Sequence, residues 1–159
     1  MNNNIKKTIM KMVLLLVPVI FSFADDVSTA DNVPFSKVER IDWNLVKVKN
    51  TSAPIVIDRT KVPREIYSIR FQGGRVHGKG ADNIYFAPYT SGENNSLSIR
   101  RITGAYMVPL FEMENFSEHD YFQCLEKVYR WELHDRKLKL YTYDKNNEAA
   151  ILEFIPIYK

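Results

Sequence analysis

The residues best able to do chemistry are spread thinly along the chain. The three histidines, His77, His119 and His134, lie far apart and lack the spacing of metal ligands. No G-x-S-x-G sequence is present, and no serine, histidine and acid stand out as partners. The single cysteine, Cys124, falls in an apolar helical stripe, which predicts a buried and inert thiol. We therefore expect no catalytic residues, no metal site and no cofactor.

The stretch from Gly73 to Gly80 contains part of a phosphate-binding pattern. It satisfies G-x-x-x-x-G-K up to Lys79, but Gly80 stands where a P-loop places Ser or Thr on magnesium. A P-loop also opens a helix, whereas the residues after Gly80 read Ala-Asp-Asn-Ile-Tyr-Phe-Ala-Pro. The pair Gly73-Gly74 is better explained as a tight hairpin connection, because glycine tolerates positive φ. We expect no nucleotide at this position.

The first 24 residues have the composition of a secretory signal peptide. They carry three lysines and no acid, followed by an apolar run over residues 12–23. Ser22-Phe23-Ala24 places small residues where signal peptidase inspects them and predicts cleavage before Asp25. The run is shorter than the ~20 residues that a membrane-spanning helix needs. With no cysteine near the cleavage point for lipid attachment, we expect a periplasmic or secreted protein that meets the membrane only during export.

Charge and length then limit the function classes. The chain has 22 Lys+Arg and 19 Asp+Glu, and loss of the signal peptide leaves the two kinds equal in number. This balance gives no support to binding of nucleic acid or of an anionic membrane. The remaining length suits one domain, and a lone cysteine cannot form an intramolecular disulfide. We expect a monomer stabilised by its hydrophobic core, with an unknown partner or small ligand.

The sequence predicts that one helix and several short strands position the residues discussed above. Ser117 and Asp120 provide a start for one helix, over about 117–129, whose apolar residues recur at three- and four-residue spacing. Short runs of β-forming residues between turn signals predict strands. These runs are 42–48, 66–71, 75–78, 84–86, 97–100, 131–133, 137–143 and 149–155. We predict an α+β fold with a strongly curled or barrel-like antiparallel sheet and one main helix, with residues 25–40 as a leader and 41–159 as the domain.

Aromatic residues are numerous, with nine tyrosines and nine phenylalanines. At alternating positions they usually build a β core. Four of them could also line a ligand cavity, namely Tyr85, Tyr89, Tyr141 and Tyr143. The sequence leaves both interpretations open.

A longer pattern resembles a known family. The stretch from Gly78 to Tyr89 is similar to the signature of the META domain, the HslJ-like family of small bacterial envelope proteins, which runs roughly G-x-x-G-C-N-x-Y-x-G-x-Y. The positions that match are Gly78, Asn83, Tyr85 and Tyr89, with Met107 matching the family's later T-x-M-A-C stretch. Further similarities are Trp43-Asn44-Leu45 with the opening W-x-L, residues 118–125 with the E-x-x-F-x-x-x-L helix, and Leu138-Lys139-Leu140 with the final L-x-L. The resemblance covers about residues 43–154.

Both family cysteines are absent. Ala81-Asp82 stands where the pattern has Gly-Cys, and Pro109 stands where it has the second cysteine. No redox or disulfide role therefore carries over, and Asp82 either fills the space of a cysteine or has a polar role of its own. Gly78 has a structural reason in a tight approach or positive φ, and Asn83 in side-chain bonds to a turn. The motif is interpreted as architecture first and as a binding site second.

The resemblance implies a compact β-rich fold with one helix in an exported protein. Some family members are linked to heat or drug stress, and none has an established enzymatic mechanism. The leading hypothesis is a non-enzymatic envelope protein that binds a protein or small ligand. One alternative is a secreted inhibitor of envelope hydrolases that uses a loop such as residues 89–95. Another is a hydrolase whose site is assembled only in the fold.

Overall fold

Ten strands and one α-helix make up the part of the chain that the computed structural model describes, residues 33–50, 53–105, 107–111 and 113–157. The expected signal peptide lies outside these residues. The strands are β1 (Trp43–Lys49), β2 (Ile55–Val56), β3 (Ser68–Gln72), β4 (Arg75–Lys79), β5 (Ile84–Ser91), β6 (Leu97–Ile99), β7 (Thr103–Gly104), β8 (Arg130–His134), β9 (Lys137–Tyr143) and β10 (Ala149–Pro156). The helix is α1 (Glu118–Glu126), and the two 3₁₀ turns are η1 (Phe35–Lys37) and η2 (Glu93–Asn95). The predicted α+β class with one main helix is confirmed.

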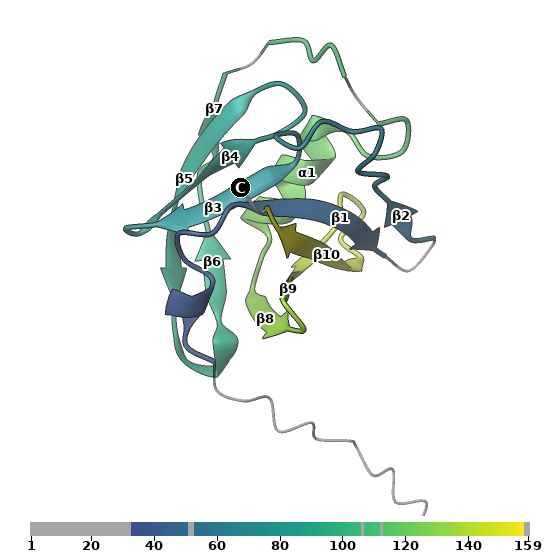
Figure 1. Ribbon diagram of the computed structural model, residues 1–159. Coiled ribbons are helices and arrows are strands. Elements are labelled where there is room, and N and C mark those ends of the chain that lie inside the picture. Colours follow the sequence, from purple (N-terminus) through teal and green to yellow (C-terminus); the bar gives the residue numbers. More distant parts are fainter. Residues whose placement is uncertain (1–32, 51–52, 106, 112, 158–159) are drawn as a thin grey trace, which may run out of the picture. The chain divides into compact units, whose positions relative to one another are not determined.

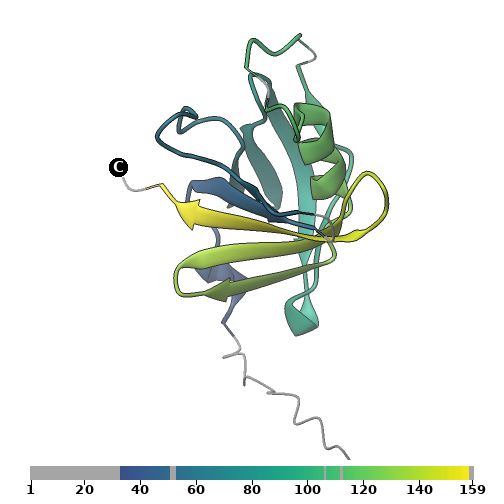
Figure 2. The same ribbon diagram turned by 90° about the vertical axis from the view of Figure 1, so that its right-hand side faces the viewer.

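All strand pairs are antiparallel and belong to one curled sheet. The strand order is β6-β5-β4-β3-β1-β10-β9-β8, with β2 beside β1 and β7 beside β5. Figure 1 shows the curl, and Figure 2 shows β10, β9 and β8 side by side in yellow and green. The two edges of the sheet approach each other, because Ser96 forms a bridge with Arg130 and the Leu97 N–H donates to the Tyr129 carbonyl at 3.2 Å. The sheet is therefore nearly closed, like a barrel, and its edges are protected.

The core lies inside the curled sheet, because the strands alternate between buried and exposed residues. β9 follows this rule, with Leu138, Leu140 and Thr142 buried. Phe35 of η1 packs its ring against three core aromatics, with ring centroids 5.1–5.4 Å away: Phe71, Tyr89 and Trp131. Residues 33–40, assigned to a leader from the sequence, thus contribute to the core.

Helix α1 begins as predicted but ends earlier. Ser117 and Asp120 form a capping box, in which the Ser117 hydroxyl accepts from the Asp120 N–H at 3.0 Å. The expected end at residue 129 is wrong, because the helix stops at Glu126. The Tyr129 N–H donates instead to the Tyr141 carbonyl at 3.0 Å. Pairing at the edge of the sheet therefore overrides the helical apolar spacing.

Strand β5 is longer than its sequence indicates. The predicted run ends at Phe86, yet the strand continues through Pro88 to Ser91. Proline lacks only the hydrogen-bond donor, and the Pro88 carbonyl still accepts from the Arg100 N–H at 3.2 Å. The preceding hairpin matches expectation, since Gly73 and Gly74 have φ of 58° and 75° and join β3 to β4.

Candidate functional site

Gly78 of the family motif allows two strands and two tyrosines to meet. A Cβ at Gly78 would lie 2.0 Å from the Ser68 carbonyl oxygen, so no larger residue fits. That oxygen accepts hydrogen bonds from the Tyr85 hydroxyl at 3.0 Å and the Tyr121 hydroxyl at 3.1 Å. Gly78 is therefore required by close approach and not by backbone conformation, because its φ is not positive.

Asn83 joins the motif to a loop and to the helix. Its side chain donates to the Met107 carbonyl at 2.8 Å and accepts from the Met107 N–H at 2.9 Å. It also donates to the Glu118 carboxylate at 2.5 Å, and its own N–H donates to the same carboxylate at 3.1 Å. Asn83 is 1% exposed and Glu118 is 8% exposed. This buried cluster positions the loop and the start of α1.

Asp82 holds the same loop further along. Its carboxylate accepts from the Leu110 N–H at 2.5 Å and the Phe111 N–H at 3.1 Å. Asp82 therefore has a polar role of its own in this chain. The loop that it holds exposes apolar side chains, with Met107 62% exposed and Val108 90% exposed. The Met107 side chain points to solvent although its backbone is bound.

The four tyrosines that the sequence offered as one cavity lining do not meet in a cavity. Tyr85 is fully buried and bonds to Tyr121, and burial raises the pKa of both phenols. Tyr89 is buried and donates to the Glu39 carboxylate. Tyr141 is half-buried and Tyr143 is exposed, and both belong to β9. The cavity interpretation of these residues is wrong, because the sheet separates them.

A different pocket, of about 630 Å³, gathers basic and apolar side chains at the ends of several strands. We call it the cationic pocket. Its basic residues are Lys37, Arg40, Arg70 and Arg136, and its apolar wall includes Ile41, Trp43, Leu133 and Ile157. Asp42 is the lining acid, and it forms an ion pair with Arg70 at 3.1 Å. Within the described residues, Lys37, Arg40 and Arg136 form no ion pair, so the pocket has an excess of positive charge.

Two of these arginines have a costly backbone conformation. Arg40 has φ of 64° and Arg136 has φ of 59°. Non-glycine residues in the left-handed region cost about 1–3 kcal/mol, although a two-residue hairpin turn requires positive φ at both of its residues. Arg136 lies in the two-residue turn between β8 and β9, where His134 pairs with Lys137. The fold therefore holds the backbones of Arg40 and Arg136 in this conformation, and both residues line the same pocket.

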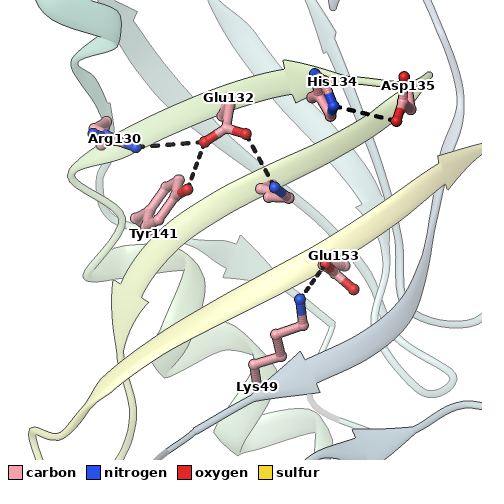
Figure 3. Close-up of polar contacts among 8 residues, drawn as sticks. Lys49, Arg130, Glu132, His134, Asp135, Tyr141 and Glu153 are labelled. Carbon is pink, nitrogen blue, oxygen red and sulfur yellow. Dashed lines mark hydrogen bonds and ion pairs between the residues drawn. The ribbon is translucent and has the colours of Figure 1, made fainter. Parts of the chain in front are cut away.

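The outer face of β8, β9 and β10 carries a separate polar network (Figure 3). Glu132 accepts from the Tyr141 hydroxyl at 2.6 Å and pairs with Lys139 at 3.0 Å. The hydrogen bond from Tyr141 and the nearby Lys139 ammonium lower the pKa of Glu132 below its usual value. Lys49 pairs with Glu153 at 2.7 Å on the same face. These cross-strand pairs satisfy one another and are typical of a solvated sheet surface.

The histidines and acidic residues do not form a metal centre in the described part of the chain. His77, His119 and His134 are all exposed. Among residues 33–157, as far as they are described, no cluster of three or more His, Cys, Asp and Glu side chains could hold a metal ion. Residues 89–91 of the loop proposed for inhibition belong to β5, and Tyr89 is buried. No helix in the described ranges is long and apolar enough to span a bilayer.

Sequence reasoning missed the cationic pocket. Its residues come from positions between 37 and 157, and only Trp43 among them matches the family pattern. No local pattern brings Arg40 and Arg136 together, because only the pairing of β1 with β10 and of β8 with β9 does so. The scattered basic residues look like an ordinary solvated surface in the sequence.

Comparison with known proteins agrees with the resemblance found in the sequence. The model of the META domain matches residues 36–154, and the chain therefore belongs to the META domain family. A search of curated proteins finds no match. Two solved structures share the fold. A protein from Burkholderia xenovorans has 14% identity and a TM-score of 0.58 over 78% of this chain and 86% of that one. A DUF4847 family protein from Bacteroides vulgatus has 11% identity and a TM-score of 0.52 over 76% and 95%.

Proposed function

We propose that this META domain protein is an exported, non-enzymatic envelope protein that binds an anionic amphiphile in the cationic pocket. The observation that carries the proposal is a cavity of about 630 Å³ that combines an apolar wall with three cations, none of which forms an ion pair with a described residue. Pockets of this size are typical of small-molecule sites, in which apolar walls provide affinity and a few polar groups fix orientation. A fatty acid or another lipid-like anion has matching chemistry.

The charge of the pocket supports an anion over a cation. Arg40 and Arg136 are exposed at the rim, and Lys37 lies beside them in the lining. Guanidinium groups bind carboxylates and phosphates through two parallel hydrogen bonds. The half-buried Ile41, Leu133 and Ile157 would cover the apolar part of the ligand. The signal-peptide composition of residues 1–24 supports an envelope location, where lipid-like anions are abundant.

The test measures binding of dibromostearate, whose bromine atoms quench nearby tryptophans. Trp43 lines the pocket, so binding there should reduce the emission of the protein. The test variant is Arg40→Asn with Arg136→Asn, since asparagine tolerates left-handed φ and removes the charge without new strain. The control is Arg64→Asn with Arg75→Asn, two exposed arginines outside the pocket lining. We expect at least about tenfold weaker binding for the pocket variant only, which corresponds to ~1.4 kcal/mol.

Dodecyltrimethylammonium, a cationic amphiphile, serves as the comparison ligand. If it binds as well as an anionic amphiphile, or if the two double variants bind dibromostearate equally, the pocket is not the anion site. Native mass spectrometry of the protein purified gently from its host's envelope tests export and occupancy together. A start at Asp25 with a retained anion supports the proposal, whereas a start at Met1 contradicts export.

A further inference from the structure

Tyr129 lies on the seam where the two edges of the sheet meet, and 46% of its surface is exposed. Its N–H donates to the Tyr141 carbonyl at 3.0 Å, and its own carbonyl accepts from the Leu97 N–H at 3.2 Å. Because both backbone groups are bonded, the fold fixes the backbone from which the ring extends. Tyr143, 40% exposed, extends the surface, with ring centroids 5.4 Å apart and planes inclined by 32°. We call these two rings the tyrosine shelf.

Two grooves run from the tyrosine shelf, and Tyr129 lines both. The first has a volume of about 430 Å³ and is rich in hydroxyl groups. These come from Thr90, Ser91, Ser96 and Ser98. The second has a volume of about 250 Å³ and includes Asn50 and Tyr141. The rest of this second lining is Lys49 and the apolar residues Ala149, Ala150 and Ile151. The exposed ring of Tyr129 therefore lies between a hydroxyl-rich groove and a largely apolar one.

Each groove also has a planar polar side chain in its lining that makes one hydrogen bond within the protein. In the first groove, Arg100 Nε donates to Ser98 Oγ at 3.1 Å. In the second, Asn50 Oδ1 accepts from the Ala53 N–H at 3.1 Å. Guanidinium and carboxamide groups each offer several hydrogen bonds in one plane. They can bind two neighbouring hydroxyl groups of a ligand at once.

The charges beside the second groove are paired within the protein. Lys49 contacts Glu153 at 2.7 Å, and Arg130 lies 4.2 Å above the centre of the Tyr141 ring and 3.5 Å from Glu132 (Figure 3). These pairs reduce the attraction of this surface for a simple anion. The tyrosine shelf thus differs from the cationic pocket, with which it shares no lining residue.

We propose that the tyrosine shelf and its two grooves bind a carbohydrate chain. A pyranose ring presents an apolar C–H face that packs on an aromatic ring, and a rim of hydroxyl groups that exchange hydrogen bonds with serine, threonine, asparagine and arginine. Tyr129 would hold one sugar, and the grooves would hold the sugars on either side. The proposal is independent of the ligand of the cationic pocket.

The test uses chitotetraose, cellotetraose and maltotetraose as probes, titrated into the purified isotope-labelled protein and followed by NMR. We expect at least one tetrasaccharide to bind with Kd below about 10 mM, a weak affinity suited to a shallow site. Tyr129→Ala should weaken binding by at least about tenfold, because the apolar contact is lost. Tyr129→Phe should keep it within about threefold, because the ring remains. Phe86→Ala is the matched control, since Phe86 is 47% exposed and outside both grooves.

Tyr143→Ala provides a second variant if Tyr129→Ala fails to fold. In the NMR titration, the largest changes in chemical shift should occur at Asn50, Ser98 and Tyr129. The proposal is wrong if none of the three tetrasaccharides binds in this range. It is also wrong if the alanine variants bind as well as the control, or if the shift changes map to the cationic pocket.

Discussion

Asn83 and Met107 are joined by a closed pair of hydrogen bonds, in which the carboxamide of Asn83 satisfies both the N–H and the carbonyl of Met107 at 2.9 and 2.8 Å. The carboxamide of Asn83 thus makes the two hydrogen bonds to the Met107 backbone that the backbone of a paired strand would make. The side chain of Met107 takes no part in this contact and is exposed. The asparagine of the motif therefore recognises the loop through its backbone.

Replacing Asn83 by alanine should destabilise the fold by about 3 kcal/mol, because it leaves buried partners unsatisfied at Met107 and Glu118. Urea denaturation measures this change. Asn146→Ala in the exposed turn before β10 is the control and should be nearly neutral. Equal midpoints for the two variants would show that the cluster does not stabilise the fold.

Gly78→Ala should be more damaging, at about 3 kcal/mol or more, because its Cβ would overlap the Ser68 carbonyl oxygen. The clash separates β3 from β4 and removes the acceptor of two tyrosines. Soluble yield and thermal unfolding are the measurements, with the exposed neighbour variant His77→Ala as control. A Gly78→Ala protein as stable as its control would mean that the strands can move apart freely.

Asp82→Ala should cost about 1–2 kcal/mol and free the amides of Leu110 and Phe111, because the carboxylate is their acceptor. Hydrogen exchange detects the loss of protection at these two amides. Asp82→Asn keeps one acceptor oxygen and should retain part of the protection. Unchanged exchange in Asp82→Ala would contradict a role of Asp82 in holding the loop.

Tyr89 makes stability depend on pH in the alkaline range. Burial, and then the hydrogen bond to Glu39, raise the pKa of Tyr89 to about 12. The unfolded phenol has a pKa of about 10. The folded state therefore favours the protonated phenol, and this stabilisation is complete below pH ~10 and lost as pH rises towards ~12.

Urea midpoints measured between pH 9 and 12 check this expectation for Tyr89. We expect Tyr89→Phe to be less stable than the unmodified protein below pH ~10, with the difference shrinking as pH rises. Tyr143→Phe is the control, because Tyr143 is exposed. A constant difference over this range would show that Tyr89 does not titrate as inferred.

Cys124 should be unreactive in the folded protein. It is 1% exposed, and burial followed by the charges of Asp144 and Asp120 raises the pKa of its thiol to about 12. Since the thiolate is the reactive form, a disulfide reagent at pH 8 should react at least about 1,000-fold faster in denaturing urea. Comparable rates with and without urea would contradict a buried thiol.

The sequence was informative where structure is local. Alternation in residues 137–143 predicts β9 with its bounds, and Ser117 with Asp120 predicts the start of α1. It was less informative where distant strands decide the outcome. Tyr129 has the spacing of a core helix residue, yet hydrogen bonds to Leu97 and Tyr141 place it at the seam and expose its ring.

The candidate sites were the least predictable part. The motif residues Asn83 and Asp82 hydrogen-bond to the backbone of a loop, and their partners lie at least 24 residues away. The cationic pocket has Arg40 and Arg136 in one lining, which follows only from the order of the strands. A local sequence pattern does not show which residues from distant parts of the chain will lie near one another in the fold.

The central position of β1 also determines when this domain can fold. β1 pairs with β10, the last strand, with Trp43 opposite Pro156. The sheet cannot complete its curl until residues more than 100 positions apart have met, and such non-local pairing makes folding slow. A ribosome would have to synthesise nearly the whole domain before its middle strand gained that neighbour. The nascent chain would thus remain incompletely folded until synthesis of the domain is almost finished.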